Sequence, residues 1–245
     1  MARVEVVADE AALAEAAARA AIAGIGAAVD EHETCTWVLT GGGTPLAAYR
    51  RLARHDLRHG VEWERVRVAM GDERCVPTSH PESNWGQAAA ALLDHVPVPD
   101  GHRLRLRGEI PAERAADEYE AVLRALPATP EGAPRLDLLW LGVGPDGHCL
   151  SLFPGRAELD ERERLVVAVH GAPKPPPDRV SLTLAALVGV ERLTVLADGQ
   201  AKAAVVARAR EGDDTLPIAR AVATVERAGG QVTWLLDRAA AGGQG

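Results

Sequence analysis

Aromatic side chains and cysteines are scarce in this chain of 245 residues, which has one phenylalanine, two tyrosines and three cysteines. With so few phenylalanine and tyrosine rings, we expect alanine, valine and leucine to fill the core. Cys35, Cys75 and Cys149 are an odd set without the spacing of a metal site, so we expect no bound metal. The simplest interpretation is a protein kept in a reducing, cytoplasmic setting.

Positive charge is also in deficit, because 27 Lys and Arg face 35 Asp and Glu and the net charge is −8. A general nucleic-acid binder is usually basic, so we expect no nucleic-acid partner. No apolar run approaches the length of a membrane span, so we predict none. The first nine residues lack a charged segment followed by an apolar one, so we expect no signal peptide and no membrane partner.

Strand and helix patterns alternate along the chain, which predicts an α/β, Rossmann-like fold with a mostly parallel sheet and helices on both faces. We expect strands near residues 36–39, 66–70, 136–141, 165–169, 193–196 and 232–236, and helices near 11–29, 45–55, 84–94, 111–126, 182–189 and 201–209. The length suits a single domain over residues 1–245. Residues 239–245 are expected to form a frayed tail.

The most informative stretch is Gly142-Val143-Gly144-Pro145-Asp146-Gly147-His148, which follows an apolar strand pattern. Ligands of open α/β sheets bind beyond the carboxyl ends of the strands. His148 is the natural proton carrier near neutral pH, and Asp146 would orient its ring or bind substrate. Glycine N–H groups of this loop are candidate oxyanion donors. A tight turn with a surface histidine is the alternative.

A second glycine loop, Thr40-Gly41-Gly42-Gly43-Thr44-Pro45, lies between a strand pattern and a helix pattern. Thr44 is a candidate N-cap, and Pro45 suits the first turn of a helix. Backbone N–H groups at such a helix start bind anions. The loop is neither a phosphate loop with a Gly-Lys-Thr/Ser ending nor a dinucleotide fingerprint, which disfavours an NAD(P) oxidoreductase. A plain strand-to-helix turn is the alternative.

A third polar loop contains Asp72-Glu73-Arg74 and, shortly after, Ser83-Asn84. Arg74 offers a planar set of donors suited to phosphate oxygens. Asp72 and Glu73 would position that arginine or contact sugar hydroxyls, and Ser83 or Asn84 would cap the next helix. A surface ion-pair turn is the alternative explanation.

These three loops, in order, resemble the glucosamine-6-phosphate isomerase/6-phosphogluconolactonase family, most closely its lactonase branch. The resemblance extends to Ser151-Leu152-Phe153-Pro154-Gly155, to Lys174 within Ala172–Pro176, to Arg179 within Asp178–Thr183, to Gly199-Gln200-Ala201-Lys202 and to Gln231–Asp237. It covers nearly the whole chain, and the block from Gly144 to Gly155 is its most specific part.

The resemblance implies hydrolysis of 6-phospho-D-glucono-1,5-lactone to 6-phosphogluconate in the oxidative pentose phosphate pathway, without a cofactor, by a monomer or weak homo-oligomer. It implies His148 and Asp146 as catalytic residues. The implied substrate and phosphate ligands are Gly41, Gly42, Gly43, Thr44, Asp72, Arg74, Ser83, Asn84, Gly147, Lys174, Arg179 and Lys202.

The sequence departs from the family pattern at four positions. Thr40 and Gly43 stand where serines are usual, and Cys149 and Leu150 replace a small Thr-Ala pair. We interpret these as tuning, since the charged residues of the pattern are present. Cys149 is not favoured as a nucleophile, because adjacent residues usually point apart.

Two other functions stay open at this stage. A deaminase/isomerase of the same family usually has Asp-Glu-Tyr in place of Asp72-Glu73-Arg74, and an acid after the Gly-His block. This chain has no acid between His148 and Gly155. A non-catalytic sugar-phosphate-binding domain would tolerate loss of His148. Among the other histidines, His80 is the next candidate, although a solvated loop histidine is the simpler explanation for it.

Overall fold

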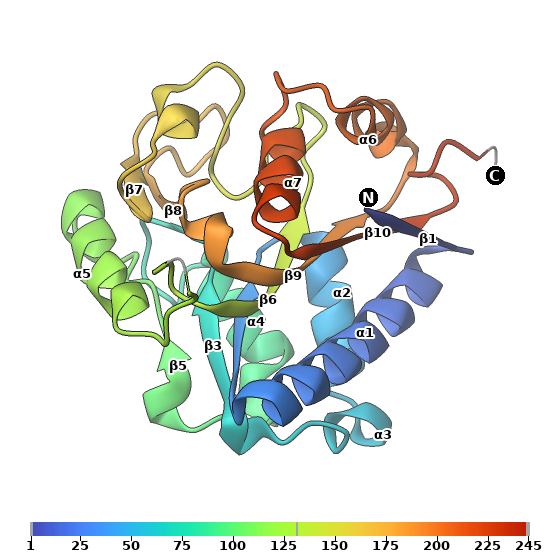
Figure 1. Ribbon diagram of the computed structural model, residues 1–245, viewed down its shortest axis with the longest axis horizontal. Coiled ribbons are helices and arrows are strands. Elements are labelled where there is room, and N and C mark those ends of the chain that lie inside the picture. The colour runs from blue at the N-terminus through green and yellow to red at the C-terminus, as the bar shows by residue number, and fades with distance from the viewer. Residues whose placement is uncertain (1, 131, 244–245) are drawn as a thin grey trace.

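The computed structural model describes residues 2–130 and 132–243, and Figure 1 shows strands surrounded by helices. The strands are β1 (Arg3–Val7), β2 (Cys35–Leu39), β3 (Val66–Met70), β4 (Asp72–Arg74), β5 (Arg103–Leu104), β6 (Leu136–Gly142), β7 (Val166–Val169), β8 (Arg179–Leu182), β9 (Val190–Ala197) and β10 (Gln231–Asp237). The α-helices are α1 (Glu10–His32), α2 (Gly43–Leu52), α3 (His55–Arg58), α4 (Asn84–Ala91), α5 (Ala112–Arg124), α6 (Ala203–Arg210) and α7 (Pro217–Arg227).

Seven strands form one sheet in the order β1-β10-β9-β6-β2-β3-β5, and every neighbouring pair is parallel. The chain builds from β2 outward to β3 and β5, and then returns to the other side of β2 with β6, β9 and β10. Helices α1 and α7 lie on opposite sides of the sheet in Figure 1. The predicted parallel α/β fold is therefore confirmed, and its strand order reverses between β2 and β6.

Helix α1 begins where the sequence predicts, because the Asp9 carboxylate accepts a hydrogen bond from the Ala12 N–H at 2.9 Å. The helix is capped at its C-terminal end by Glu33, whose φ of 65° is left-handed. With a mean hydropathy of 1.5 over 18 residues, this helix is long and apolar enough to span a membrane by composition. The expectation that no run reaches that length was therefore wrong. Here its alanine-rich face, with Leu13 and Ile25, is buried within the fold.

A second sheet of three antiparallel strands, β4-β8-β7, lies beside the large one. The predicted helix over residues 182–189 is wrong, because the segment begins inside β8 and continues into a 3₁₀ turn at Ala186–Gly189. The predicted strand near 165–169 exists as β7, but it belongs to this small sheet. The amphipathic helix α7 was missed, although Pro217 at its first turn is a start signal.

Gly71, between β3 and β4, is the joint between the two sheets. Its N–H donates to the Leu39 carbonyl and its own carbonyl accepts from the Leu182 N–H, both at 2.8 Å. A Cβ at this position would lie 2.5 Å from Leu150 Cδ2. The sheets therefore meet at the end of β2, at a position where any larger residue would displace the Leu150 side chain.

Alanine, valine and leucine make up most of the core, as expected. The largest fully buried side chains, however, are Trp37, Trp140 and Trp234. Tyr49 stacks on Trp140 with ring centroids 5.4 Å apart, and Trp37 meets Trp140 edge-on at 5.0 Å. The scarcity of phenylalanine and tyrosine is thus offset by tryptophan, which buries a larger surface per residue.

The predicted frayed tail begins as a turn that packs on the fold. Ala240 is fully buried, and its N–H donates to Asp237 Oδ1 at 2.7 Å. The expectation of fraying from residue 239 is therefore wrong for this turn. Its last part, residues 244–245, lies outside the described residues.

Candidate active site

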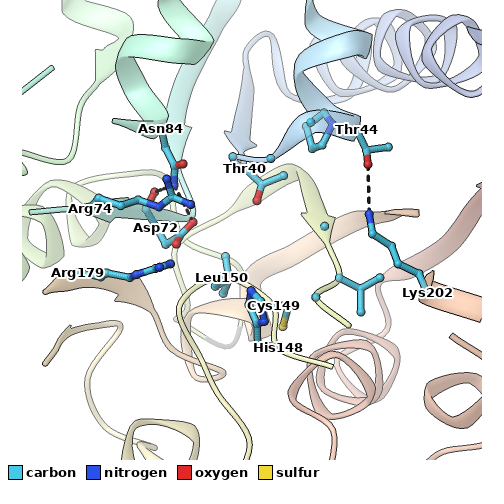
Figure 2. A pocket seen from close by; sticks show the side chains of 17 residues that line it. Thr40, Thr44, Asp72, Arg74, Asn84, His148, Cys149, Leu150, Arg179 and Lys202 are labelled. Carbon is cyan, nitrogen blue, oxygen red and sulfur yellow. Dashed lines mark hydrogen bonds between the residues drawn. The ribbon is translucent and has the colours of Figure 1, made fainter. Parts of the chain in front are cut away.

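A cavity of about 150 Å³ opens at the reversal of strand order between β2 and β6, and Figure 2 shows it from close by. Ligands of open α/β sheets bind at this kind of position. The lining residues are Thr40, Gly41, Gly42, Gly43, Thr44, Pro45, Asp72, Arg74, Asn84, Gly142, Val143, Gly144, His148, Cys149, Leu150, Arg179 and Lys202. The fold thus brings together most of the predicted site residues, while Asp146, Ser83, Gly147 and Lys174 lie outside this lining.

The loop after β2 presents backbone to the cavity. Gly42, with a φ of 109°, is the N-cap of α2, so the prediction of Thr44 as the cap is wrong. No side chain among the described residues caps this helix. The first N–H groups of a helix have no partner inside it, and the start of a helix carries partial positive charge. This loop therefore offers donors and a positive potential to an anion.

The loop after β6 presents the histidine. His148 Nδ1 lies 2.5 Å from Asp146 Oδ1, and the imidazole packs beside Phe153 with ring centroids 4.8 Å apart. A Cβ on Gly144 would lie 2.1 Å from two ring atoms of His148. With Nδ1–H donating to the carboxylate, Nε2 keeps a free lone pair. Glycine at position 144 is therefore what allows the ring to sit against its own loop.

Burial lowers the pKa of His148, and the hydrogen bond and charge of Asp146 only partly oppose this shift. Burial alone would raise the pKa of Asp146, but its hydrogen bond to His148 and the nearby positive charges lower it. At neutral pH the pair is thus an ionised carboxylate holding a neutral imidazole. Such an imidazole is ready to accept a proton.

The same loop uses two of the glycine N–H groups that were candidate oxyanion donors. The Gly144 N–H donates to the His148 carbonyl and the Gly147 N–H to the Gly144 carbonyl, both at 2.9 Å. Neither is therefore free to bind an oxyanion. Gly147, with a φ of 83°, packs against Leu216 and accepts the Ile218 N–H, so it anchors the loop to α7.

Asp72 and Asn84 form a buried polar wall on one side of the cavity. Asp72 accepts hydrogen bonds from Ser151 Oγ at 2.6 Å and from Asn84 Nδ2 at 3.2 Å. Asn84 also donates to the Asp72 carbonyl at 3.0 Å. The orientation of this carboxylate is therefore set by donors from two distant parts of the chain.

Glu73 stabilises the segments that carry this polar wall. Its buried carboxylate accepts hydrogen bonds from the Ser83 hydroxyl and from the N–H groups of Arg74, Asn84 and Trp85, at 2.7–2.9 Å. Burial raises the pKa of Glu73, and these hydrogen bonds oppose the shift. Ser83 caps α4, as predicted, by accepting the Gly86 N–H. The predicted contact of Ser83 with substrate has no support in this geometry, because its hydroxyl points away from the cavity to Glu73.

Two arginines reach the cavity from the small sheet. Arg74 donates from Nη1 to the Glu82 carbonyl at 2.8 Å, and its buried Nε has no hydrogen-bond partner among the described residues. Arg179 donates to the carbonyls of Pro176 and Lys174 at 3.0 and 2.9 Å. Arg179 thereby holds the proline-rich segment of residues 170–177, called the rim below, as well as lining the cavity.

The opposite side carries Lys202, which donates to Thr44 Oγ1 at 3.4 Å (Figure 2) and to Asp198 Oδ1 at 3.1 Å. Asp198 also accepts the Thr44 hydroxyl. Burial alone would raise the pKa of Asp198, but these partners lower it. Sequence reasoning missed Asp198, although its place just after a strand is the signal that identified the other loops. Lys174 is half-exposed and lies 3.9 Å from Asp146, outside the cavity.

The four departures from the family pattern have different consequences. Leu150 lines the cavity with a left-handed φ of 55° and fills the space beside Gly71. Cys149 is buried, and burial raises the pKa of its thiol far above the usual range, so it is not a reactive thiolate. A Cβ on Gly43 would meet nothing within 4 Å, so glycine is not sterically required there. The Thr40 N–H donates a hydrogen bond to the Tyr49 hydroxyl oxygen, and the same hydroxyl donates to the Thr40 carbonyl.

One group of possible metal ligands occurs in the described part of the chain, at Glu31, His32 and Glu191. It lies where α1 ends and β9 begins, whereas the cavity lies beyond the carboxyl ends of the strands. It therefore does not contribute to the site.

Comparison with known proteins identifies the family. The sequence model described as glucosamine-6-phosphate isomerases/6-phosphogluconolactonase matches residues 8–234. The chain belongs to the glucosamine-6-phosphate isomerase/6-phosphogluconolactonase family. A family member from Mycobacterium tuberculosis, named 6-phosphogluconolactonase, is 40% identical over 245 residues, covering 97% of this chain and 96% of the relative. One of the same name from Streptomyces coelicolor is 39% identical, covering 95% and 91%.

Solved structures of the family agree with this fold. The 6-phosphogluconolactonase from Trypanosoma brucei superposes with a TM-score of 0.85 at 30% identity, covering 99% of this chain and 98% of the other. A monomeric glucosamine-6-phosphate deaminase superposes with a TM-score of 0.80 at 22% identity, which shows a shared fold alone.

Proposed function

We propose that this protein hydrolyses 6-phospho-D-glucono-1,5-lactone to 6-phosphogluconate, with His148 as the general base. The observation that carries the proposal is the His148–Asp146 pair beside a cavity with free helix N–H groups and cationic side chains. The lactonase relatives, similar over nearly the full chain, support the choice of substrate.

In this proposal the phosphate lies against the start of α2, where the N–H groups of Gly41 to Thr44 would bind its oxygens. Lys202 reaches this loop through Thr44 and supplies positive charge. The guanidinium groups of Arg74 and Arg179 complete the positive lining. Lys202 is preferred to Lys174, because Lys174 lies outside the cavity.

Hydrolysis then needs one proton carrier. Water attacks the lactone carbonyl carbon while His148 Nε2 takes one of its protons. The tetrahedral intermediate collapses by breaking the bond between that carbon and the ring oxygen. The imidazolium returns the proton to the ring oxygen, which becomes a hydroxyl of the open-chain acid. Asp146 keeps the imidazole in the tautomer that this sequence requires and stabilises its charged form.

The test is hydrolysis of the lactone generated in situ, followed beyond its spontaneous rate. We expect the wild-type protein to accelerate hydrolysis and His148→Ala to lose about 10²-fold or more. His80→Ala is the matched control, because His80 is an exposed loop histidine outside the cavity. No acceleration by the wild-type protein would reject the proposal, and turnover of glucosamine 6-phosphate would then favour the deaminase/isomerase alternative. Binding of either compound without turnover would indicate a sensor domain.

The proposal also carries the expectation of a cytoplasmic enzyme that is a monomer or a weak homo-oligomer. Size-exclusion chromatography with light scattering over a range of protein concentrations tests the oligomeric part.

A further inference from the structure

Asp198 places a negative charge next to the side chains on which the proposed phosphate site depends. It follows directly after β9, and its carboxylate accepts hydrogen bonds from the Thr44 hydroxyl and from Lys202 Nζ, the latter at 3.1 Å. Thr44 and Lys202 both line the cavity, whereas Asp198 does not. In Figure 2 these two residues lie on one side of the cavity, opposite Asp72 and Arg74. Asp198 therefore acts on a ligand through the two groups that it holds.

The hydrogen bonds within this group occupy donors that an anion would use. A threonine hydroxyl has a single hydrogen, and that of Thr44 is donated to Asp198. The ammonium group of Lys202 donates to Asp198 and also, at 3.4 Å, to Thr44 Oγ1. The side chains of Asp198 and Lys202 are only 26% and 23% exposed, so water and salt screen their charges less than at the open surface. The positive charge of Lys202 is therefore partly neutralised beside the cavity.

The turn that carries Asp198 is held by other groups. Both carboxylate oxygens of Asp237, at the end of β10, accept the Gly199 N–H at 3.1 Å. The backbone N–H of Lys202 donates to the Gly199 carbonyl, also at 3.1 Å. Among the described residues, the side-chain partners of the Asp198 carboxylate are Thr44 and Lys202. Both partners line the cavity, which points to a role for this carboxylate in binding rather than in folding.

We propose that Asp198 is a built-in counter-ion of the phosphate site, which weakens the binding of phosphate monoesters by competing with them for Lys202 and Thr44. This inference rests on the phosphate position of the proposed function and deepens it. A phosphate monoester carries a charge of about −2 near pH 7. Like charges brought close together at a binding site oppose binding. The reaction leaves the phosphate unchanged, so the same counter-ion also favours release of the product. Asp198 is then an affinity-determining residue that takes no part in the chemistry.

The first experiment measures the Kd of 6-phosphogluconate and of inorganic phosphate by calorimetry. Asp198→Asn removes the charge with little change of shape, and we expect both Kd values to fall about 10-fold, as expected for the loss of a like charge close to the ligand. Thermal unfolding should stay near that of the wild type. Asp198→Ser is a second neutral variant and should tighten binding as well. Unchanged or weaker binding by these neutral variants would overturn the inference.

Asp213→Asn is the matched control. Asp213 also accepts hydrogen bonds from a cation and a threonine hydroxyl, Arg208 Nη2 and Thr215 Oγ1, both at 2.6 Å. It lies outside the cavity, and its substitution changes the net charge by the same amount. Both Kd values should stay within about twofold of the wild type, since a distant exposed charge is screened by salt. A gain equal to that of Asp198→Asn would mean that only the net charge matters, which would overturn the inference.

Asp198→Glu separates charge from shape. This variant keeps the negative charge on a longer side chain, so we expect it to tighten binding by less than about twofold. Tightening equal to that of Asp198→Asn would show that the geometry of the group, and not its charge, limits the affinity. That result would overturn the inference.

Steady-state kinetics separate the counter-ion role from a positioning role. The phosphate does not react, so stronger binding of it should stabilise the ground state and the transition state equally. In Asp198→Asn the KM for the lactone should therefore fall while kcat does not rise. A higher KM would show that Asp198 is needed to position Lys202, which overturns the inference. The calorimetric test needs no turnover. A protein that fails to hydrolyse the lactone but binds 6-phosphogluconate more tightly as Asp198→Asn would reject only the proposed function.

Discussion

The seven-stranded sheet and the three-stranded sheet contribute different kinds of group to one cavity. The parallel sheet ends in loops that present free backbone N–H groups at α2 and the imidazole of His148. The antiparallel sheet supplies charged side chains, Asp72 and Arg74 from β4 and Arg179 from β8. In the proposed mechanism, the large sheet would provide the proton carrier and the anion site, and the small sheet would provide the side chains that hold the substrate.

The difference shows in how each group is held. His148 is positioned within its own loop, by Asp146 two residues away and by the space above Gly144. Asp72 and Arg179 both contact the hydroxyl of Ser151, which comes from a distant part of the chain, at 2.6 and 3.5 Å. Arg179 also donates to the carbonyls of Lys174 and Pro176, which lie five and three residues before it. If the sheets divide the work in this way, damage to the first should lower kcat and damage to the second should raise KM.

The largest effect should come from Gly144→Ala. The added methyl group would lie 2.1 Å from the His148 ring, so the imidazole must leave its position. We expect kcat to fall about 100-fold, as expected for a displaced general base, while the protein stays folded. Steady-state kinetics and thermal unfolding measure the two effects separately.

Gly26→Ala is the matched control, because this exposed glycine lies inside α1 and its added methyl group meets nothing within 4 Å. The substitution should leave kcat unchanged and stabilise the helix by up to about 1 kcal/mol. An active Gly144→Ala enzyme would show that the ring is not held by this contact.

A smaller effect, on KM, should follow from Arg179→Lys. Lysine cannot reproduce the planar fork that bonds the rim carbonyls and faces the cavity at once. We expect kcat/KM to fall about 10-fold or more, mainly through KM, in line with the loss of a charged hydrogen bond worth about 1.5–3 kcal/mol.

Arg156→Lys separates substrate binding from rim stability. Arg156 also donates to the rim, at the carbonyls of His170 and Gly171, but it does not line the cavity. Its replacement should leave KM within about twofold. A rise in KM equal to that of Arg179→Lys would mean that both arginines act only by holding the rim.

The smallest effect is a displacement of the pH profile. The base must be unprotonated to act, so kcat/KM should fall as the pH drops through the pKa of His148. Burial lowers that pKa, so the acid limb should have its midpoint below about 6.5. Asp146 opposes the shift, and Asp146→Asn should therefore move the limb to still lower pH. Rates corrected for spontaneous hydrolysis between about pH 5 and pH 8 test both statements; a midpoint above about 6.5 would contradict them.

The parallel half of the molecule was predictable because its signals are local. Apolar runs followed by glycine-containing loops placed β2, β3 and β6 and located His148 beside Asp146. The antiparallel half was less predictable: a strand was expected near β7, but a helix was expected from the last residue of β8 onward, and β4 is only three residues long. Short strands carry little periodic signal, and their pairing decides their structure.

The sequence alone determined which chemical groups follow the strands: glycine N–H groups after β2, a His–Asp pair after β6 and a lysine after β9. Each depends on residues that are close together in the chain. Only the tertiary structure decided that Asp72 pairs with Ser151, that Asp198 joins Thr44 to Lys202, and that Asn84 Oδ1 stays unpaired. The physical reason is that these contacts depend on parts of the chain that only the packing of the sheets and helices brings together.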